Sequence, residues 1–324
     1  MSKSVVYVGA DVGKSEVVVA VAGLRPREFH NTGHGVRALV QWLRRVAGNQ
    51  MFQVCMEATG IYSRRLALRL LRQPEVQVSI INPAQIKAFR QVLLRRTKTD
   101  GVDAAIILAY AQSQQPRLWQ PGSIVQEELA SLVKEADRLR GLRVRSRNRR
   151  EHNDGDPALV RRIERALQRF LQAQLVQIDL AIERLCQSDE GLSEQVALLR
   201  TIPGLGNKSA TQLLTYGGVA LQERSAKELT AHAGLAPGHR LSGSSVRGRS
   251  RIDKQGDRRL RTALYMPTLV AIRYNPVIKT FYQRLIENGK TKKLALVASM
   301  RKLLIMCRAI LRTKTQFNPD LALT

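Results

Sequence analysis

Residues 5–22 read VVYVGADVGKSEVVVAVA and form the first strongly extended stretch of the chain. Two runs rich in β-branched residues, 5–10 and 16–22, flank a short polar insert at 11–15. Because β-branched residues favour extended backbone and the insert carries turn-forming residues, the stretch predicts a β-hairpin at the start of a sheet.

The segments after this hairpin alternate between helical and extended patterns. In chain order they predict a helix over 35–46, a strand over 52–56 closed by Glu57, a helix over 62–71, a strand over 76–81 and a helix from about 100 to about 114. We interpret Asn82-Pro83 as a stop after the last strand. The order predicts an α/β domain over 1–120, with a mixed sheet and flanking helices.

Between about 126 and 199 the extended pattern disappears. Apolar residues three or four positions apart predict a helical hairpin or coiled coil over 121–198, with its turn at 151–157; they are Ile163, Leu167, Leu171, Leu175, Ile178, Ile182 and Leu185. A run of arginines that includes Arg143 and Arg147 precedes the turn. It fits either a nucleic-acid contact or a solvated helix face.

A second, mainly helical domain is predicted over 199–324. The stretch 201–210, TIPGLGNKSA, is typical of a helix-hairpin-helix whose backbone N–H groups, with Lys208, bind a phosphate, although such turns also simply cap helices. Residues 240–261 predict a basic loop that leads into a helix. Near the C-terminus, Met300, Leu303, Leu304 and Cys307 form an apolar stripe that we expect to pack in the core.

The charge of the chain indicates a polyanionic partner. Its 324 residues include 53 Lys and Arg against 26 Asp and Glu, a formal net charge of +27. With no apolar run of about 20 residues and no signal-peptide pattern, we expect a cytoplasmic, nucleoid-associated bacterial protein with no membrane partner. Three isolated cysteines argue against a disulfide framework and a thiolate zinc site.

Four acidic residues lie where strands end or a helix begins: Asp11, Glu57, Asp100 and Asp103. Carboxylates that meet in a cleft form the all-oxygen site that Mg²⁺ or Mn²⁺ prefers, and two such ions promote phosphodiester cleavage. Each acid also has an ordinary explanation. Asp11 fits a turn, Asp100 an N-cap, Asp103 a favourable place near the helix dipole, and Glu57 an ion pair with an arginine.

Seven motifs occur in an order that matches one known family. They are MEATGIY (56–62), INPAQIKAF (81–89), RTKTDGVDA (96–104), IPGLG (202–206), AGLAP (233–237), SGSSVRGRSRI (242–252) and RRLRTALYMP (258–267). The chain resembles the DEDD insertion-sequence transposases, which are bridge-RNA-guided recombinases. The resemblance implies a RuvC-like, ribonuclease-H-type domain whose metal-binding tetrad is Asp11, Glu57, Asp100 and Asp103, followed by a C-terminal transposase domain.

The resemblance also implies a catalytic serine at Ser242, which would form a covalent phosphoserine link to DNA. From the residues alone, Ser244 and Ser245 serve equally well. A serine hydroxyl is a weak nucleophile until a base, a metal ion or positive charge activates it. Arg247, Arg249 and Arg251 follow closely and would stabilise a charged phosphorane.

Because Ser242 lies far along the chain from Asp103, one subunit need not bring the two together. The resemblance implies composite sites in a homo-oligomer, a dimer or tetramer, and the helical hairpin is a candidate dimerisation element or a simple spacer. Basic residues precede Asp100 and would hold a phosphate backbone over the metal ions, or serve as surface charge; they are Lys87, Arg90, Arg95, Arg96 and Lys98.

The expected partners are donor and target DNA and, from the resemblance, a noncoding guide RNA. The chain shows no zinc finger, RNA-recognition aromatic pattern or recognition helix, which is consistent with sequence choice by base pairing. Two other functions fit the residues. One is a Holliday-junction resolvase that uses metal-activated water, and the other is a non-enzymatic nucleic-acid-packaging protein. Covalent trapping on DNA would exclude the first, and loss of cleavage in Asp11→Ala would exclude the second.

Overall fold

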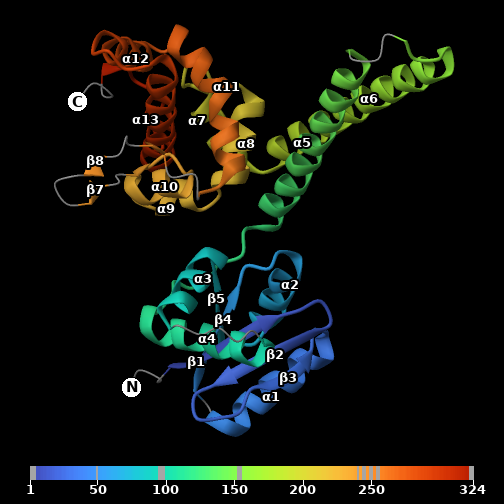
Figure 1. Ribbon diagram of the computed structural model, residues 1–324, viewed down its shortest axis with the longest axis vertical. Coiled ribbons are helices and arrows are strands. Elements are labelled where there is room, and N and C mark those ends of the chain that lie inside the picture. Colours follow the sequence, from blue (N-terminus) through green and yellow to red (C-terminus); the bar gives the residue numbers. More distant parts are fainter. Residues whose placement is uncertain are drawn as a thin grey trace. The chain divides into compact units, whose positions relative to one another are not determined.

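The computed structural model describes residues 5–48, 50–93, 99–151, 155–238, 241–242, 246–247, 251–252 and 256–320. The chain divides into two compact units, Met1–Pro121 and Gly122–Thr324 (Figure 1). Nowhere in these described ranges does a helix combine the length and the apolar character needed to span a bilayer.

The first unit contains a five-stranded mixed sheet in the order β3-β2-β1-β4-β5. Its strands are β1 (Val5–Val12), β2 (Glu16–Val21), β3 (Arg27–His30), β4 (Met51–Glu57) and β5 (Val76–Ile81). β1 pairs antiparallel with β2, which confirms the predicted hairpin, and β2 pairs antiparallel with β3. β4 runs parallel to β1 and to β5. This is the strand order of a ribonuclease-H-type sheet, with β1 at its centre.

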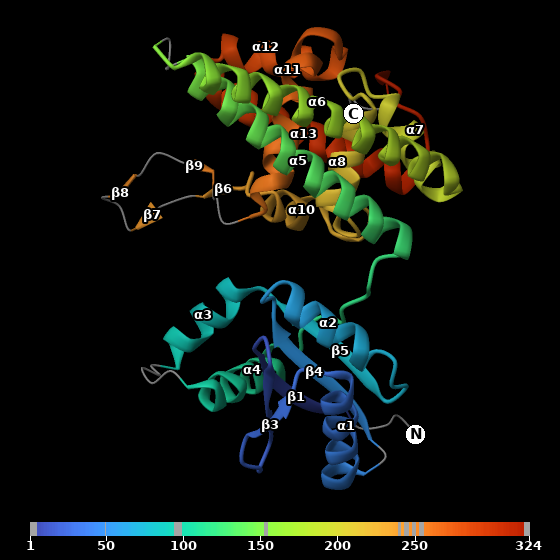
Figure 2. The same ribbon diagram turned by 90° about the vertical axis from the view of Figure 1, so that its right-hand side faces the viewer.

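Helices cover both faces of this sheet (Figure 2). On one side, α1 (Gly33–Ala47) and α2 (Ile61–Leu70) pack against the side chains of Val8, Ala10 and Val12. On the other lie α3 (Pro83–Val92) and α4 (Asp100–Gln114). Because side chains alternate along a strand, the odd-numbered residues of β1 point towards α4.

Two elements of this unit differ from the sequence prediction. Strand β3 was not predicted, because three of its four residues are exposed polar or charged ones at the edge of the sheet and only Phe29 is apolar. Helix α3 was not predicted either, because Asn82-Pro83 was interpreted only as a stop. The Asn82 side chain accepts a hydrogen bond from the backbone N–H of Ala84, and Pro83 occupies the first helical turn, where its missing N–H costs nothing.

In the second unit two long helices pack along each other: α5 (Ile124–Glu151) and α6 (Ala158–Ser188). Leu171, Leu175 and Ile182 are buried, as their spacing suggests. The first two members of the predicted stripe differ, since Ile163 is 57% exposed and Leu167 is 42% exposed. The apolar pattern of α6 therefore continues onto a surface that α5 does not cover. The predicted turn falls partly on 152–154, outside the described residues.

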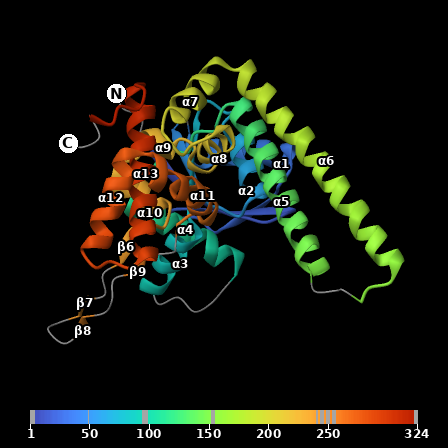
Figure 3. The same cartoon turned by 90° about the horizontal axis from the view of Figure 1, so that it is seen from above.

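The remaining helices form one bundle around a shared core (Figure 3). They are α7 (Glu190–Arg200), α8 (Asn207–Gly217), α9 (Ala220–Glu223), α10 (Ala226–His232), α11 (Arg258–Tyr274), α12 (Pro276–Glu287) and α13 (Lys292–Thr313). The predicted C-terminal stripe is confirmed, because Leu303, Leu304 and Cys307 are fully buried and Met300 nearly so. Helix α8 begins directly after the glycine turn, with Gly206 as its N-cap.

Between α10 and α11 the backbone forms two short antiparallel strand pairs. β6 (Pro237–Gly238) pairs with β9 (Arg251–Ile252), and β7 (Leu241–Ser242) pairs with β8 (Val246–Arg247). The sequence predicted a loop here that leads into a helix, and α11 is that helix. The extended pairs within the loop had no clear sequence signal, since each strand has only two residues.

Candidate active site

Asp11 and Glu57 lie at the same edge of the first unit's sheet. β1 and β4 are parallel neighbours with Ala10 opposite Met56, so Asp11 and Glu57 are the next residues along the two strands. Cys55, two positions before Glu57, is buried in the core patch that contains Ile106 and Ile107 of α4. Glu57 therefore shares the α4 face of the sheet with Asp11.

Gly9 brings α4 onto the backbone of β1. A Cβ atom built at Gly9 would lie 2.2 Å from the carbonyl oxygen of Ala104 and 2.4 Å from the backbone nitrogen of Leu108. No side chain fits in that space. Because Asp11 is two positions further along the same face, this close approach places it beside the start of α4, next to Asp103.

Asp100 and Asp103 lie in the first turn of α4. Thr99 is the N-cap of this helix, and its side chain accepts a hydrogen bond from the backbone N–H of Val102. The N-cap explanation of Asp100 is therefore wrong. Residues three apart on a helix share a face, so both carboxylates project from the same side of α4.

The charges of Glu57, Asp100 and Asp103 all act on Asp11, and we call these four residues the acid corner. The pKa of Asp11 is raised above its ordinary value, first by burial and then by the negative charges of Asp103, Asp100 and Glu57. A backbone hydrogen bond with Val12 opposes the shift. Since charge effects of this kind fall off with distance, the other three carboxylates lie close enough to Asp11 to repel its negative charge.

The acid corner is not closed into a ligand cage. Over the described ranges, no group of three or more His, Cys, Asp or Glu side chains is placed to hold a metal ion together. Asp103 instead forms an ion pair with Arg90 of α3, and the two side chains are only 15% and 22% exposed. Helix α3 is held on α4 by an edge-to-face contact between Phe89 and Tyr110.

The backbone of Ser242 lies in β7, opposite Val246. The backbones of Arg247 and Arg251 lie in β8 and β9. The side chains of these three residues, and all of Ser244, Ser245 and Arg249, fall outside what the structure describes. The predicted site of the serine is thus placed only at the level of its strand pair.

The other predicted nucleic-acid contacts have varied surroundings. Lys87 is exposed on α3, whereas Arg95, Arg96 and Lys98 lie outside the described residues. On α5, Arg143 is exposed and donates a hydrogen bond to the side chain of Gln172, and Arg147 is also exposed.

Lys208 faces a protein-lined cavity of about 440 Å³ between α5, α6, α7 and α8. Its Nζ lies 4.0 Å from a carboxylate oxygen of Asp179. Burial, and then the charge of Arg140, lower the pKa of Lys208. This lysine therefore has an intramolecular partner, a role that the glycine-turn motif did not indicate.

Asp137 of α5 joins the helix pair to the bundle, and sequence reasoning missed it. Its carboxylate accepts hydrogen bonds from Arg140 at 2.9 Å, Gln212 at 2.8 Å and the Tyr216 hydroxyl at 2.6 Å. Arg140 also donates to Asp179 of α6 at 2.6 Å. No sequence signal marks this network, because Asp179, Gln212 and Tyr216 are distant in sequence from Asp137 and Arg140. Gly9 was also missed, although a glycine within a β-branched run is a known sign of close backbone approach.

Two protein-family models match the chain, one over the first unit and helix α5 and the other over the helical bundle that follows α6. A DEDD-type model described as "Transposase" matches residues 8–152, which include the acid corner. A model described as "Transposase IS116/IS110/IS902 family" matches residues 196–283, which include β7 and α11.

Full-length relatives decide the assignment. The pilin gene-inverting protein of Moraxella bovis is 33% identical over 98% of this chain and 98% of its own length. The protein of the same name from Moraxella lacunata is also 33% identical over 98% of both chains. The chain belongs to the IS110-type family of DEDD transposases. An insertion-element protein of Streptomyces coelicolor is 31% identical over 37% of this transposase and 30% of its own length.

The transposase is therefore an enzyme that cleaves and rejoins DNA, and its substrates are DNA. The DEDD-type family uses divalent metal ions, which agrees with the acids of the first unit. The matches are to a DEDD family, so they lend no support to classing this chain among serine recombinases. They also favour neither the junction resolvase nor the packaging protein.

Proposed function

We propose that this transposase binds Mg²⁺ or Mn²⁺ in the acid corner and cleaves DNA there. The main observation is the raised pKa of Asp11, which shows that burial and neighbouring carboxylates oppose its ionised form. A bound cation offsets that repulsion, and carboxylate oxygens are the donors these ions prefer. Divalent ions in such a site stabilise the attacking and leaving oxygens of phosphodiester cleavage.

Asp11 and Glu57 would hold the ions from the strand ends, and Asp100 and Asp103 from the first turn of α4. Arg90 engages one oxygen of Asp103, and in this proposal it releases that oxygen when the carboxylate becomes a ligand. We infer that Arg90 then turns to the DNA backbone, where its guanidinium fits a phosphate. Lys87, exposed on the same helix, would bind the same backbone, and Arg95, Arg96 and Lys98 are proposed contacts from the sequence.

For the covalent step we propose Ser242 as the nucleophile. Its hydroxyl oxygen loses its proton and attacks the phosphorus, and the departing DNA oxygen takes up a proton and leaves as a hydroxyl. The phosphoserine ester conserves the energy of the broken bond, so the reverse attack by a DNA hydroxyl rejoins the strand. Three arginines near Ser242 in the sequence, Arg247, Arg249 and Arg251, would stabilise the charged phosphorane.

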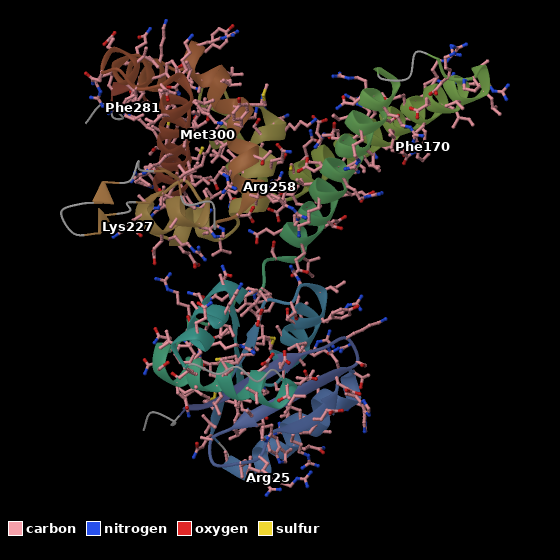
Figure 4. All side chains as sticks on the ribbon, in the orientation of Figure 1. Arg25, Phe170, Lys227, Arg258, Phe281 and Met300 are labelled. Atoms are coloured by element: carbon pink, nitrogen blue, oxygen red, sulfur yellow. The ribbon has the colours of Figure 1, made fainter. Side chains whose placement is uncertain are left out.

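We further propose that the transposase works as a homo-oligomer with composite sites, in which one protomer's acid corner meets another's Ser242. This proposal is supported by an unpartnered apolar stripe on α6. Leu159 is 56% exposed, Ile163 is 57% exposed and Phe170, labelled in Figure 4, is 58% exposed; the three are spaced by four and seven positions. Such spacing suits pairing with the α6 of a second copy. In this scheme 1–120 bears the metal ions, 121–198 joins protomers and 199–324 supplies the serine.

A noncoding guide RNA is the proposed source of target choice, on the strength of the family resemblance. Exposed arginines on α5, Arg143 and Arg147 among them, are candidate contacts to its backbone. The Moraxella relatives are named for inverting a pilin gene. We infer that the same cleavage and rejoining gives insertion, excision or inversion, depending on how the two DNA sites are placed.

Trapping on a suicide DNA substrate tests the covalent step. A nicked substrate that cannot be rejoined should leave DNA attached to the wild-type protein and to the controls Ser244→Ala and Ser245→Ala. Attachment should disappear in Ser242→Ala, with DNA binding retained. If Ser242→Ala still becomes attached, the serine assignment is wrong. Sequencing of small RNA that co-purifies from the native host tests guidance, and full activity of RNA-free protein would contradict it.

A further inference from the structure

The turn between β1 and β2 lies at the end of the sheet that carries Asp11. Gly13 donates its backbone N–H to the carbonyl oxygen of Glu16 at 2.8 Å, so Lys14 and Ser15 form a two-residue tip. We call these two residues the β1–β2 tip, and both are exposed. Lys14 is three positions beyond Asp11, which places their Cα atoms at most about 11 Å apart. The lysine side chain would therefore reach DNA that is bound at the acid corner.

Asn31, the residue after β3, holds this turn in place. Its side-chain amide donates to the Gly13 carbonyl oxygen at 3.0 Å, and its backbone N–H donates to the Ser15 carbonyl oxygen at 2.7 Å. Arg69 of α2 donates to the Asn31 carbonyl oxygen at 3.0 Å and to its side-chain oxygen at 3.4 Å. The two carbonyl groups that flank Lys14 are thus both bound by Asn31, which is itself held by a cationic side chain.

The hydrogen-bond donors of the tip have no such partners. Within the described ranges, no protein acceptor binds the backbone N–H groups of Lys14 and Ser15, the Ser15 hydroxyl or the Lys14 ammonium group. Glu16 is the acid next to the tip, yet in the described structure no ion pair joins it to Lys14. The turn therefore uses its acceptors within the protein and leaves its donors available to a negatively charged ligand.

We propose that the β1–β2 tip binds a phosphate of the DNA strand that is cut at the acid corner, with Asn31 and Arg69 as positioning residues. Successive backbone N–H groups of a turn form an anion-binding site, and a lysine adds a full positive charge. Lys14 is also the described cation nearest to Asp11 along the chain, so it would offset the repulsion between the strand and the acids. This inference rests on the proposed function, because it takes the acid corner as the place where DNA is cut.

A scan with neutral linkages tests the contact in single-turnover cleavage of the suicide DNA substrate by full-length transposase from the native host. One phosphate at a time near the cut is replaced by a methylphosphonate, which lacks the negative charge. For the wild type, replacement of the contacted phosphate should raise the protein concentration at half-maximal rate about tenfold and leave the maximal rate nearly unchanged, because that linkage does not react. Lys14→Gln should show the higher concentration with the unmodified substrate, and the same replacement should then change it less than about twofold.

Arg45→Gln is the matched control for the loss of charge. Arg45 is an exposed cation in the last turn of α1, which leads into the start of β4 at the opposite end of the sheet. This variant should keep the wild-type concentration at half-maximal rate and the wild-type response to the neutral linkage. If Lys14→Gln behaves as Arg45→Gln does, the tip does not bind the strand and the proposal is wrong.

Asn31→Ala tests the positioning role. It should raise the concentration at half-maximal rate as Lys14→Gln does, and the double variant should be no worse than either single one, since both act on one contact. Arg69→Lys keeps a donor for Asn31 and should retain most of the affinity. Additive losses in the double variant would overturn the role of Asn31. Wild-type cleavage by Asp11→Asn, with the effect of Lys14→Gln intact, would contradict the acid corner and not the phosphate contact.

Discussion

The ionised form of Asp11 is disfavoured in the folded, metal-free protein, and the effect on stability can be tested by changing the pH. Its folded-state pKa is raised above the ordinary value of 3.8 by burial and by three neighbouring acids. At pH values above the raised pKa, the Asp11 carboxylate is ionised in both the folded and the unfolded state. Its surroundings then lower the stability of the folded state by the full amount. This loss of stability disappears as the pH drops through the pKa of Asp11 in the folded state towards its pKa in the unfolded state.

Asp11→Asn should therefore raise the Tm of the metal-free transposase at neutral pH, because it removes one of the mutually repelling charges. The difference from the wild type should shrink as the solution is acidified. In saturating Mg²⁺ the wild type should have the higher Tm of the two. Cleavage by Asp11→Asn should fall by about a thousandfold or more. Thermal scans at several pH values measure this. A lower Tm for Asp11→Asn throughout the pH range would contradict the repulsion.

Arg90 forms an ion pair with Asp103, and in the proposed function this guanidinium would compete with metal ions for that carboxylate. Arg90→Gln should tighten Mn²⁺ binding about fivefold in the absence of DNA, and weaken DNA binding. Calorimetric titration with Mn²⁺ measures the first effect. Lys87→Gln removes the same charge from an exposed position of α3 and should leave Mn²⁺ affinity nearly unchanged. Equal effects of both variants would show that only the general charge of α3 matters.

At the scale of the element, the position of α4 depends on the missing side chain at Gly9. Gly9→Ala would place a Cβ atom 2.2 Å from the Ala104 carbonyl oxygen, so α4 must move away from β1. We expect a loss of about 1–3 kcal/mol in unfolding free energy, and reduced cleavage because Asp100 and Asp103 move with the helix. Urea denaturation measures the change in unfolding free energy.

Gly33 provides the control for this change. A Cβ atom at Gly33, the first residue of α1, meets nothing within 4 Å. Gly33→Ala should leave both stability and cleavage close to those of the wild type. If Gly9→Ala also left stability and cleavage unchanged, α4 would not be held in place by its close approach to β1.

The link between α5 and α8 is a second element-scale feature. Tyr216→Phe removes the hydrogen bond of 2.6 Å from its hydroxyl to Asp137, but keeps the ring. We expect a cost of about 1–2 kcal/mol, because Asp137 retains Arg140 and Gln212 as donors. Tyr265→Phe, on an exposed face, should have no effect on the urea midpoint. If the two variants had identical urea midpoints, the hydrogen bond from Tyr216 to Asp137 would not stabilise the contact between α8 and α5.

How far the sequence predicts these elements depends on whether the signal is local. The first hairpin and the C-terminal stripe follow from side-chain periodicity, and both are present. Strand β3 was not predicted because its mostly exposed edge residues show no hydrophobic alternation. Helix α3 was not predicted because an Asn-Pro pair can both end a strand and begin a helix. The ion pair of Arg90 could not be predicted, since it depends on how α3 packs against α4. For the same reason, no sequence pattern indicates that Asp179 is the partner of Lys208.

For the whole molecule, the net charge of +27 and the family assignment agree on nucleic acid as the partner. The family resemblance grouped Asp11, Glu57, Asp100 and Asp103 as a tetrad, although Asp11 and Asp103 are far apart along the chain. The sheet explains why, because parallel strands end at one edge and α4 begins beside it. The chain thus concentrates negative charge in one small corner of an otherwise basic protein, and in the proposed function a divalent ion would offset it.

Anomalous diffraction at the manganese edge, from crystals grown with Mn²⁺, tests this claim most directly. We predict a peak within coordination distance of carboxylate oxygens from Asp11 and Glu57 and from at least one of Asp100 and Asp103, with Arg90 turned away from Asp103. A saturated crystal with no peak among these four carboxylates, or with its peak at another site, would contradict the account.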